Sequence, residues 1–274
     1  MSSGIKKRTG SEYSDGRPGR INYHSEDEYR TITLLVQSTA YDMQDVAHLR
    51  DAVNELFDGE LMIREMRIKS AEVEYESMGQ RTGELQLESP EYVNGKQIKV
   101  AMVNSTEIDD TTLVSTFTVE FETTESPYFE TIYTTLELHD SGYSATAEKY
   151  GLVDNIDDEK VKYRFTENNF SVYNAGNVTI QPENMLLHIN VDAVQSSNNF
   201  TIRNKTTGEE VILKRESNGS NFRVQGMVIS LGGITNVFRD TNREFISLVP
   251  GDNDFEVLNG TFSEIRFVFK FLYK

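Results

Sequence analysis

The chain has 274 residues, 37% hydrophobic and 26% charged, so it is long enough for one large or two ordinary domains with buried cores. It contains 27 Lys and Arg against 44 Asp and Glu, and this net charge of −17 disfavours binding to nucleic acid phosphates or anionic membranes. With 0 Cys and 0 Trp, it has no disulfide, thiolate metal site or cysteine nucleophile, and it lacks the strongest side chain for stacking on sugars.

The start of the chain does not favour export or membrane insertion. Lys6, Lys7 and Arg8 are basic, but no apolar run follows them, so we expect no secretory signal. No stretch approaches the roughly 20 consecutive apolar residues of a membrane-spanning helix. We therefore expect a protein made in a cytoplasm, with no membrane binding.

One segment of the first half has helical periodicity. Its apolar residues, at intervals of three and four, are Val46, Leu49, Val53, Leu56 and Phe57. Asp42 and Asp45 give an acidic first turn, and Gly59 stands where a helix would stop. The pattern predicts an amphipathic helix over about 42–57, about four turns long, whose stripe packs on its own sheet. We expect no other long helix in the chain.

Most of the remaining sequence has the alternation of half-buried β-strands. One core-facing row is predicted at Thr111, Leu113, Ser115, Phe117, Val119 and Phe121. A second and more hydrophobic row consists of Ile265, Phe267, Phe269, Phe271 and Tyr273. A strand as apolar as this second one must be paired and buried, because an exposed one would aggregate.

Turn signals separate the predicted strands and become frequent after about residue 163. They are Asn94-Gly95, Thr207-Gly208, Asn218-Gly219, Gly232-Gly233, Pro250-Gly251-Asp252-Asn253 and Asn259-Gly260, the last predicting a hairpin between the two final strands. The strand pattern lapses in the polar stretch between about Leu138 and Val161. We therefore predict a mainly β protein of two domains: an N-terminal β domain with one helix over 1–150, and a β-sandwich over 160–274.

The sequence shows no coherent catalytic, cofactor or metal site. It has neither a nucleophile elbow nor a nucleotide-binding glycine pattern. The 4 His residues, His24, His48, His139 and His188, have no metal-ligand spacing, and His48 is typical of a solvated helix surface. Asp252-Asn253-Asp254 lacks the glycine and the glutamate of a calcium loop and is typical of a turn, and residues 154–159 are typical of a solvated linker. We expect no enzyme activity and no cofactor.

One acidic feature is ordered. Glu72, Glu74 and Glu76 share one face of a predicted strand whose other face is more apolar. Two interpretations stay open for this row. It is a solvated outer face, or it is a surface that repels a polyanion.

The layout of the whole chain resembles a known family. The elements that carry the resemblance are the basic start, Gly19-Arg20, Tyr23, Tyr29-Arg30-Thr31-Ile32-Thr33-Leu34, the helix over 42–57, the strand start Gly59-Glu60-Leu61, the strand over 117–121, Ser126-Pro127-Tyr128-Phe129, Pro250-Gly251-Asp252-Asn253 and the aromatic strand over 265–273. In this order they resemble the distal tail proteins (Dit) of long-tailed siphophages that infect Gram-positive bacteria. The Pro-Gly-Asp-Asn turn before an aromatic final strand is the most specific part.

The resemblance implies a fold and an assembly. It implies an N-terminal domain related to tail tube proteins, six copies of which form a ring, and a galectin-like C-terminal sandwich on the outside of that ring. Such a protein is a non-enzymatic component of the virion tail tip or baseplate, assembled in the host cytoplasm. It joins the tail tube protein to the tail-associated hub protein and anchors receptor-binding proteins or their adaptors.

The resemblance also gives the acidic row a meaning. DNA would pass through the lumen of the ring without specific binding, since basic residues there would trap its phosphates. Glu72, Glu74 and Glu76 are our candidates for an acidic lumen lining.

Two other functions stay open. A carbohydrate-binding receptor-recognition module would use aromatic residues of the C-terminal sandwich, with Tyr173, Phe200 and Phe222 as candidates, although burial in the core is the more common role of such residues. A major tail tube protein would polymerise into a tube instead of closing a single ring.

Overall fold

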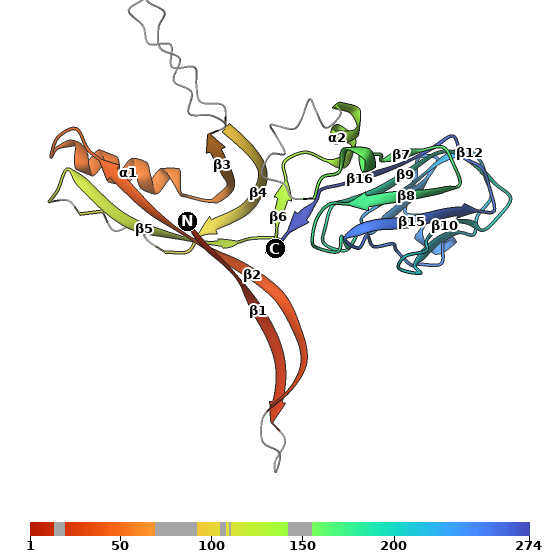
Figure 1. The fold of residues 1–274 in the computed structure, drawn as a ribbon, viewed down its shortest axis with the longest axis horizontal. Coiled ribbons are helices and arrows are strands. Elements are labelled where there is room, and N and C mark those ends of the chain that lie inside the picture. Colours follow the sequence, from red (N-terminus) through yellow and green to blue (C-terminus); the bar gives the residue numbers. More distant parts are fainter. Residues whose placement is uncertain (14–19, 69–91, 105–107, 110, 142–154) are drawn as a thin grey trace, which may run out of the picture. The chain divides into compact units, whose positions relative to one another are not determined.

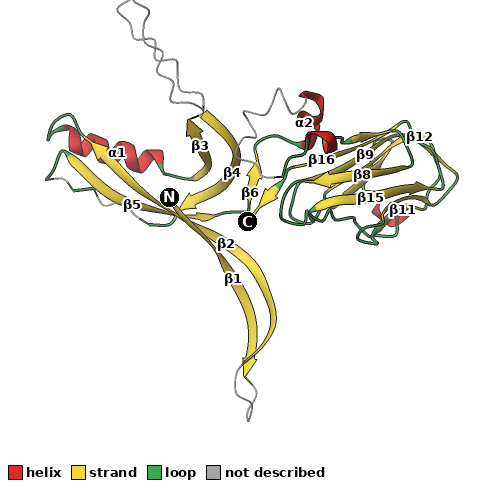
Figure 2. Cartoon of the chain, viewed as in Figure 1, coloured by secondary structure: helices red, strands yellow, loops and turns green. Residues whose placement is uncertain are grey.

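The structure is a computed structural model that describes residues 1–13, 20–68, 92–104, 108–109, 111–141 and 155–274. The chain is mainly β, as the alternating pattern predicts (Figure 1, Figure 2). The described strands are β1 (Ser2–Tyr13), β2 (Arg20–Thr39), β3 (Glu60–Ile68), β4 (Tyr92–Met102), β5 (Val114–Thr123), β6 (Phe129–Thr131), β7 (Arg164–Phe165), β8 (Asn169–Asn174), β9 (Leu187–Ser196), β10 (Phe200–Asn204), β11 (Glu210–Leu213), β12 (Ser217–Gln225), β13 (Val228–Leu231), β14 (Ile234–Thr235), β15 (Gly251–Leu258), β16 (Glu264–Phe269) and β17 (Leu272–Tyr273). The described helices are α1 (Asp45–Leu56) and α2 (Thr135–Ser141), with the 3-10 turns η1 (Asp158–Lys160) and η2 (Phe238–Asp240).

The chain divides into two compact units. The first comprises Met1–Arg64, Gln97–Phe129 and Lys274, and the second comprises Glu65–Lys96 and Glu130–Tyr273. Neither unit is one continuous stretch, so each depends on contacts between residues far apart in the sequence. The predicted end of the first domain, at residue 150, lies outside the described residues.

An antiparallel sheet forms the frame of the first unit. Its strand order is β1-β2-β5-β4, and β3 pairs with β4. Buried and exposed residues alternate along β5 as predicted, with Phe117, Val119 and Phe121 at most 5% exposed. The same predicted row was too long at its start. Leu113 is 42% exposed and Thr111 is also exposed, because both precede the strand and leave its buried face.

Helix α1 begins later than the predicted residue 42 because the chain enters it through a turn. The Asp42 carboxylate accepts hydrogen bonds from the backbone N–H groups of Gln44 and Asp45, at 2.9 Å each. These bonds satisfy donors that the start of a helix leaves without partners. Gly59 follows the helix at the predicted stop, with a φ of 79° that favours glycine.

The apolar stripe of α1 packs as predicted except at its end. Val46 is 3% exposed, and the next two apolar residues of the stripe are half-buried. Leu56 is 65% exposed, contrary to the prediction. Phe57 makes the contact instead, with its ring 5.7 Å from that of Phe121. The stripe therefore ends at the residue after the helix, and Leu56 stays on the surface.

The periodicity of the sequence does not predict helix α2 of the second unit. It has 7 residues and two leucines, too few to show a helical repeat. The backbone N–H and the hydroxyl of Thr134 both donate to the Glu137 carboxylate, at 2.7 and 2.8 Å, and so begin the helix. Leu138 is 0% exposed, and the Thr135 hydroxyl donates to the Phe267 carbonyl in β16 at 2.9 Å.

A β-sandwich makes up most of the second unit. One sheet has the order β11-β10-β15-β8, and the other has the order β14-β13-β12-β9-β16-β7. The two sheets share an aromatic core, in which the ring of Phe170 in β8 lies 4.3 Å from Phe165 in β7 and 5.6 Å from Phe255 in β15. The predicted final row is buried as expected: Ile265, Phe267, Phe269, Phe271 and Tyr273 are at most 3% exposed.

The turn signals predict some connections correctly and others wrongly. Thr207-Gly208 and Gly232-Gly233 join neighbouring strands, as predicted. Asn259-Gly260 does not close a hairpin, because β15 and β16 belong to different sheets and the turn carries the chain between them. Asn94-Gly95 lies inside β4. Asn218-Gly219 lies inside β12, where a shifted register and a φ of 80° at the glycine mark a β-bulge.

Three buried asparagines hold the loops of the four-stranded sheet. Asn174, Asn204 and Asn253 are at most 1% exposed. The Asn253 amide nitrogen donates to the carbonyls of Val249 and Gly251, at 2.8 and 3.1 Å. Its Oδ1 accepts from the Val249 N–H at 2.9 Å and from Asn204 Nδ2 at 3.2 Å. The side chain of Asn253 therefore holds the Pro-Gly-Asp-Asn turn in place at the start of β15.

We predict that Asn253→Ala lowers the free energy of unfolding of the second unit by about 2–4 kcal/mol, because it leaves several buried backbone groups without partners. Urea denaturation of the full chain, followed by circular dichroism, measures this change. Asp254→Ala, the exposed next residue of β15, is the control and is expected to change the same quantity by about 0.5 kcal/mol or less. Equal effects of the two variants would contradict the prediction.

Candidate functional site

Part of the predicted site falls outside the described residues. This holds for Glu72, Glu74 and Glu76, and for Asp154 at the start of the predicted linker. The described part of that linker contains η1, whose last residue, Lys160, pairs with an aspartate of β15 at 2.7 Å. The candidate site is therefore built from other residues.

The titratable residues considered for metal binding do not come together. His24 and His48 are exposed, and His139 and His188 are half-buried. Partial burial lowers the pKa of His188. In Asp252-Asn253-Asp254 successive side chains point to opposite faces of β15, which does not suit a loop that gathers ligands around calcium. In the described part of the chain, no three or more His, Cys, Asp or Glu side chains are grouped to hold a metal ion.

Strands β1 and β2 form a two-stranded ribbon that continues past the rest of their sheet (Figure 1). β1 pairs with β2 from Ser2↔Thr33 to Tyr13↔Arg20, whereas β2 pairs with β5 only from Thr31 onward. The residues of β1 up to Thr9 are exposed apart from one half-buried isoleucine. A two-stranded hairpin is marginally stable on its own in water. The ribbon is therefore a candidate contact with another molecule.

Arg30 fixes the base of this ribbon. It is 6% exposed, and its Nε donates to the Pro127 carbonyl at 2.8 Å. Its Nη1 donates to Ser3 Oγ at 2.8 Å, and its guanidinium lies 5.0 Å from the centre of the Phe129 ring. Arg30, Pro127 and Phe129 all belong to segments that carry the family resemblance, so those segments build one structural contact.

Asp27 makes a second contact at the base of the ribbon. Its side chain is 6% exposed and lies 2.9 Å from Lys274 Nζ, 2.9 Å from the Tyr128 hydroxyl and 3.8 Å from Lys7 Nζ. The hydrogen bond from Lys274 lowers the pKa of Asp27. Burial and the neighbouring Asp27 carboxylate raise the pKa of Tyr128 to about 12. The base of β2 is thus held to residues far along the chain.

The face of β2 and β5 opposite the core is open in the described part of the first unit. Thr116, Thr118 and Glu120 of β5 are exposed, and Glu122 is intermediate. On β2, Leu35 is 75% exposed on this same face. The alternation of the sequence already indicated that Glu120 and Glu122 avoid the core. Nothing in the sequence distinguished them, because glutamate on a solvated strand face is common.

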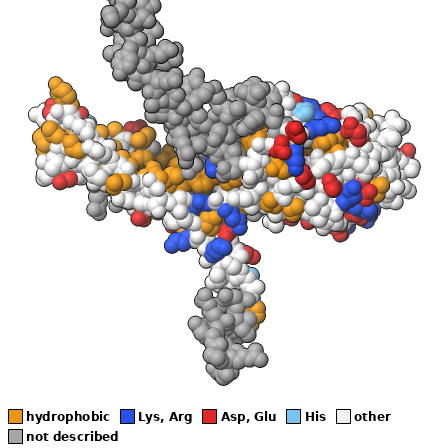
Figure 3. All heavy atoms as spheres, in the orientation of Figure 1, with side chains coloured by type: hydrophobic (Ala, Val, Ile, Leu, Met, Phe, Trp, Pro, Cys, Tyr) orange, Lys and Arg blue, Asp and Glu red, His pale blue; other side chains and the backbone are white. Residues whose placement is uncertain are grey.

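Exposed apolar side chains gather on the first unit. Tyr41 is 92% exposed, and Leu35 and Leu56 are 75% and 65% exposed. The other large apolar side chains exposed on this unit are Met1, Tyr23, Met43, Met62, Val103, Leu113 and Val114. Among the described residues of the second unit they are Leu186, Met227 and Val228. Hydrophobic side chains are visible at the surface around α1 in Figure 3, and such a concentration is typical of an interaction surface.

The aromatic residues considered for sugar stacking have different environments. Phe200 and Phe222 are 0% exposed and pack edge to face in the core, with their ring centres 6.3 Å apart. Tyr173 lines an open cleft of about 620 Å³ at the edge of the four-stranded sheet. Its hydroxyl donates to the Asn155 carbonyl at 2.8 Å, and Lys160 Nζ lies 4.8 Å from the centre of its ring. Lys160 therefore occupies one face of the Tyr173 ring.

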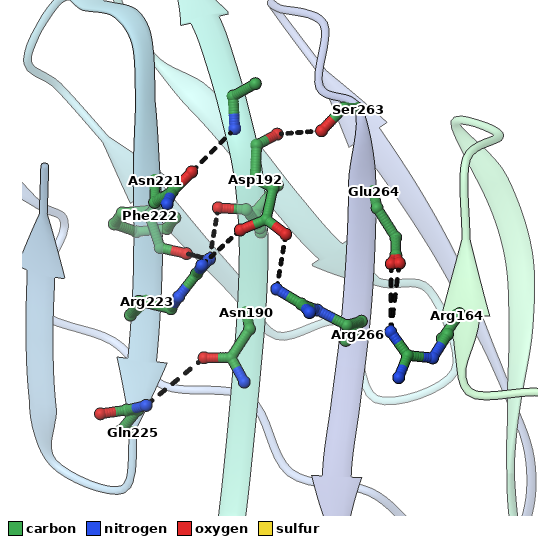
Figure 4. Close-up of polar contacts among 12 residues, drawn as sticks. Arg164, Asn190, Asp192, Asn221, Phe222, Arg223, Gln225, Ser263, Glu264 and Arg266 are labelled. Atoms are coloured by element: carbon green, nitrogen blue, oxygen red, sulfur yellow. Dashed lines mark hydrogen bonds and ion pairs between the residues drawn. The ribbon is translucent and has the colours of Figure 1, made fainter. Parts of the chain in front are cut away.

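Paired charges cover the outer face of the six-stranded sheet (Figure 4). Asp192 of β9 pairs with both Arg223 of β12 and Arg266 of β16. Arg164 of β7 pairs with Glu264 of β16 at 3.3 Å and with a carboxylate of α2 at 2.9 Å. Positive and negative charges balance in this group, so it is better explained as a stabilised polar surface than as an ion-binding site.

Comparison with known proteins identifies the fold. No protein-family model and no curated protein matches the sequence. The crystal structure of the SPP1 Dit protein (gp 19.1) matches 97% of this chain and 89% of its own chain, with a TM-score of 0.59 and 10% sequence identity. This chain has the fold of a distal tail protein.

The resemblance inferred from the residues is therefore confirmed at the level of the fold. The SPP1 Dit protein is described as a paradigm of the hub adsorption apparatus in phages that infect Gram-positive bacteria. The phage p2 baseplate in its activated conformation, with Sr or with Ca, matches 97% and 98% of the chain and 87% of its own in both cases, with a TM-score of 0.35 and identities of 11% and 10%. Among the described residues, no helix of this distal-tail-protein fold is long and apolar enough to cross a membrane.

We predict that Asp27→Asn lowers the free energy of unfolding at pH 7 by about 1–3 kcal/mol, because the buried side chain loses its charged hydrogen bonds. The pKa of Asp27 is lowered in the folded chain from an ordinary value of 3.8, so its stabilisation is complete above that value and is lost as the pH falls through the folded pKa. The difference between the two proteins should therefore shrink below about pH 4.

Thermal and urea denaturation between pH 7 and pH 3 measure this difference. Asp51→Asn is the control, because Asp51 is 76% exposed on α1 and its ion pair with Arg50 spans 3.8 Å. A difference for Asp27→Asn that is the same at pH 7 and pH 3 would show that its carboxylate charge does not matter.

Proposed function

We propose that this chain is a structural, non-enzymatic protein of a phage tail tip, the distal tail protein of a virion that infects a Gram-positive bacterium. The observation that carries the proposal is the match of the distal-tail-protein fold over 97% of the chain. The protein is assembled into the tail in the host cytoplasm. It joins the tail tube protein to the tail-associated hub protein, and its second unit anchors receptor-binding proteins or adaptors.

In this proposal six copies of the first unit close into a ring. The exposed apolar side chains around α1 support such an assembly, since a monomer gains nothing from leaving Tyr41, Met43 and Leu56 in water. Ring closure requires two different contact surfaces on each copy. The β1–β2 ribbon and the surface around α1 are two such surfaces.

The open face of β2 and β5 faces the lumen in this proposal. It is rich in threonine and carries Glu120 and Glu122. Like the candidate row Glu72, Glu74 and Glu76, these acids would keep DNA from adhering as it passes. The candidate residues of the lumen lining are therefore Glu120 and Glu122, in addition to the row inferred from the sequence alone.

The two alternative functions have less support. A carbohydrate-binding module loses two of its three aromatic candidates, because Phe200 and Phe222 are in the core. A major tail tube protein would share the exposed apolar surface but would form long tubes. A single closed ring would support a distal tail protein, whereas a tube of many stacked rings would support a tail tube protein.

We predict that Tyr41→Glu combined with Leu56→Glu weakens assembly by at least about tenfold in concentration, because both residues lose apolar contacts and bring charge into the interface. Size-exclusion chromatography with light scattering, over a range of concentrations, measures the mass of the assembly. Met227→Glu, at a residue that is 49% exposed on the second unit, is the control and should assemble like the original chain. Unchanged assembly of the double variant would remove the surface around α1 from the interface.

We predict that Glu120→Lys combined with Glu122→Lys makes the assembled protein retain double-stranded DNA at low salt, because a basic lumen holds phosphates. Filter binding at increasing salt should show retention that falls steeply with ionic strength. Glu183→Lys combined with Glu216→Lys has the same change in net charge on exposed residues of the second unit and serves as the control. Equal retention by both double variants would mean that overall charge, and not the open face of β2 and β5, decides DNA binding.

A further inference from the structure

Strand β8 is an edge strand whose outer side lies along the open cleft of the second unit. The four-stranded sheet has the order β11-β10-β15-β8, so among the described strands β8 has one neighbour, β15. Four of the 6 residues of β8 line the cleft of about 620 Å³: Asn169, Phe170, Ser171 and Tyr173. An edge strand beside a cleft is a ready template for an added strand.

The hydrogen-bond pattern shows which backbone groups of β8 face outward. The Val257 N–H of β15 donates to the Asn168 carbonyl at 2.8 Å, so the residues of even number face β15. The Tyr173 carbonyl faces the other way and accepts the Tyr163 hydroxyl at 2.9 Å. By the same alternation, the N–H and C=O groups of Asn169 and Ser171 point away from β15 and are available for a further strand.

The opposite edge of the same sheet is closed. Along β11, the Ile212 N–H donates to Asn242 Oδ1 at 3.0 Å, and the Asn242 N–H donates to the Ile212 carbonyl at 3.1 Å. Asn242 Nδ2 donates to the Glu210 carbonyl at 2.7 Å. The chain itself therefore covers one edge of the sheet in the way that proteins use to prevent strand addition. In the part of the chain that the structure describes, the edge at β8 between Asn169 and Ser171 lacks such a cover.

The side chains around this edge indicate what kind of strand would fit. Phe165 and Phe170 of the cleft lining stack with their ring centres 4.3 Å apart. Phe165 is 3% exposed, so the half-buried Phe170 is the aromatic side chain that the cleft leaves accessible. Lys160 is already paired with Asp252 at 2.7 Å, and Lys162 with Glu167 at 3.8 Å.

The cleft lining contains two further carboxylates, which do not pair with its lysines. Glu159 and Asp254 are exposed and form no ion pair among the described residues. The uncompensated charge of the cleft is therefore negative, and it is complementary to a basic segment.

We propose that β8 is a docking site for an extended, basic peptide segment of a partner protein, which adds to the sheet as a strand beside Asn169 and Ser171. Apolar side chains on one face of the segment contact the half-buried Phe170. Lysine or arginine side chains on the segment reach toward Glu159 and Asp254. This binding does not depend on ring formation, so it can be tested apart from the proposed assembly.

The test uses a fluorescent, acetylated decapeptide in which Lys and Val alternate, and an otherwise identical peptide with Glu in place of Lys. Fluorescence anisotropy with the full chain is expected to show saturable binding of the Lys-Val peptide below about 1 mM. The Glu-Val peptide is expected to bind at least about tenfold more weakly, because its charge repels the cleft. Absence of saturable binding of the Lys-Val peptide up to that concentration would overturn the proposal.

Two variants of Ser171 separate strand addition from simple charge attraction. Ser171→Pro removes the outward N–H and leaves the backbone hydrogen bonds to β15, so it should fold and weaken binding of the Lys-Val peptide by at least about tenfold. Both Ser171 variants lose the hydrogen bond that Ser171 Oγ donates to the Asn253 carbonyl at 3.4 Å, so this loss does not separate them. Ser171→Ala keeps that N–H and should bind like the original chain. Unfolding temperatures of the two variants check that the sheet is intact. Equal binding by the two folded variants would show that no strand is added at β8.

A charge variant tests the second half of the proposal. Asp254→Asn combined with Glu159→Gln should lower the affinity for the Lys-Val peptide by about three- to tenfold and reduce the salt dependence of its binding. Glu183→Gln combined with Glu216→Gln, which neutralises two exposed glutamates outside the cleft, is the control. Equal affinity of both double variants would contradict recognition of basic side chains at this edge.

Discussion

The β2–β5 sheet of the first unit buries one face and leaves the other open, and the proposed function depends on this constraint. Phe117, Val119 and Phe121 lie on the buried face, where Phe121 contacts Phe57, the residue after α1. The open face and the surface around α1 leave apolar side chains in water, of which Tyr41 at 92% is the most exposed. Burial of such surface is the main favourable term in protein association. We therefore propose that the surface around α1 is covered by another copy in the assembled ring.

The second unit buries most of its large apolar side chains within itself. Its two sheets bury a continuous aromatic core, and its loops are held by Asn174, Asn204 and Asn253. The buried asparagines satisfy backbone groups that would otherwise be costly to bury. Among the described strands, the four-stranded sheet has a covered edge at β11 and an open edge at β8, and the latter is the place proposed for a partner. The two units divide the proposed work between assembly and anchoring.

The elements that the sequence predicts well are those in which one period extends over many residues. The alternation over 115–121 and 265–273 and the helical spacing from Val46 to Val53 all identify the buried face correctly. Each of these patterns arises because one side of the element meets a core and the other meets water.

The features that the sequence does not predict depend on contacts between distant residues. Helix α2 has too few residues for a period, and its position is fixed by Leu138 and by a hydrogen bond to β16. Asn259-Gly260 has the chemistry of a hairpin turn, and the same chemistry also serves a crossing between sheets. The pairing of β15 and β16 with strands of different sheets decides that this turn is a crossing and not a hairpin. The open edge at β8 is likewise a property of the assembled sheet and has no signature in its own six residues.

The charge of the chain has a more specific meaning in the light of the fold. A net charge of −17 disfavours a DNA-binding protein, and in a ring of six copies the total is roughly −100. A wall of that sign suits a passage that DNA crosses without adhering. The acidity thus argues against binding to DNA and is compatible with surrounding it.

The central claim is that the first unit closes into a ring, and imaging of the purified chain by negative-stain electron microscopy tests it most directly. The account predicts closed rings of one size with sixfold symmetry. Isolated monomers at high concentration, both alone and in the presence of the tail tube protein, would contradict it, and long tubes would show that the chain is a tube subunit.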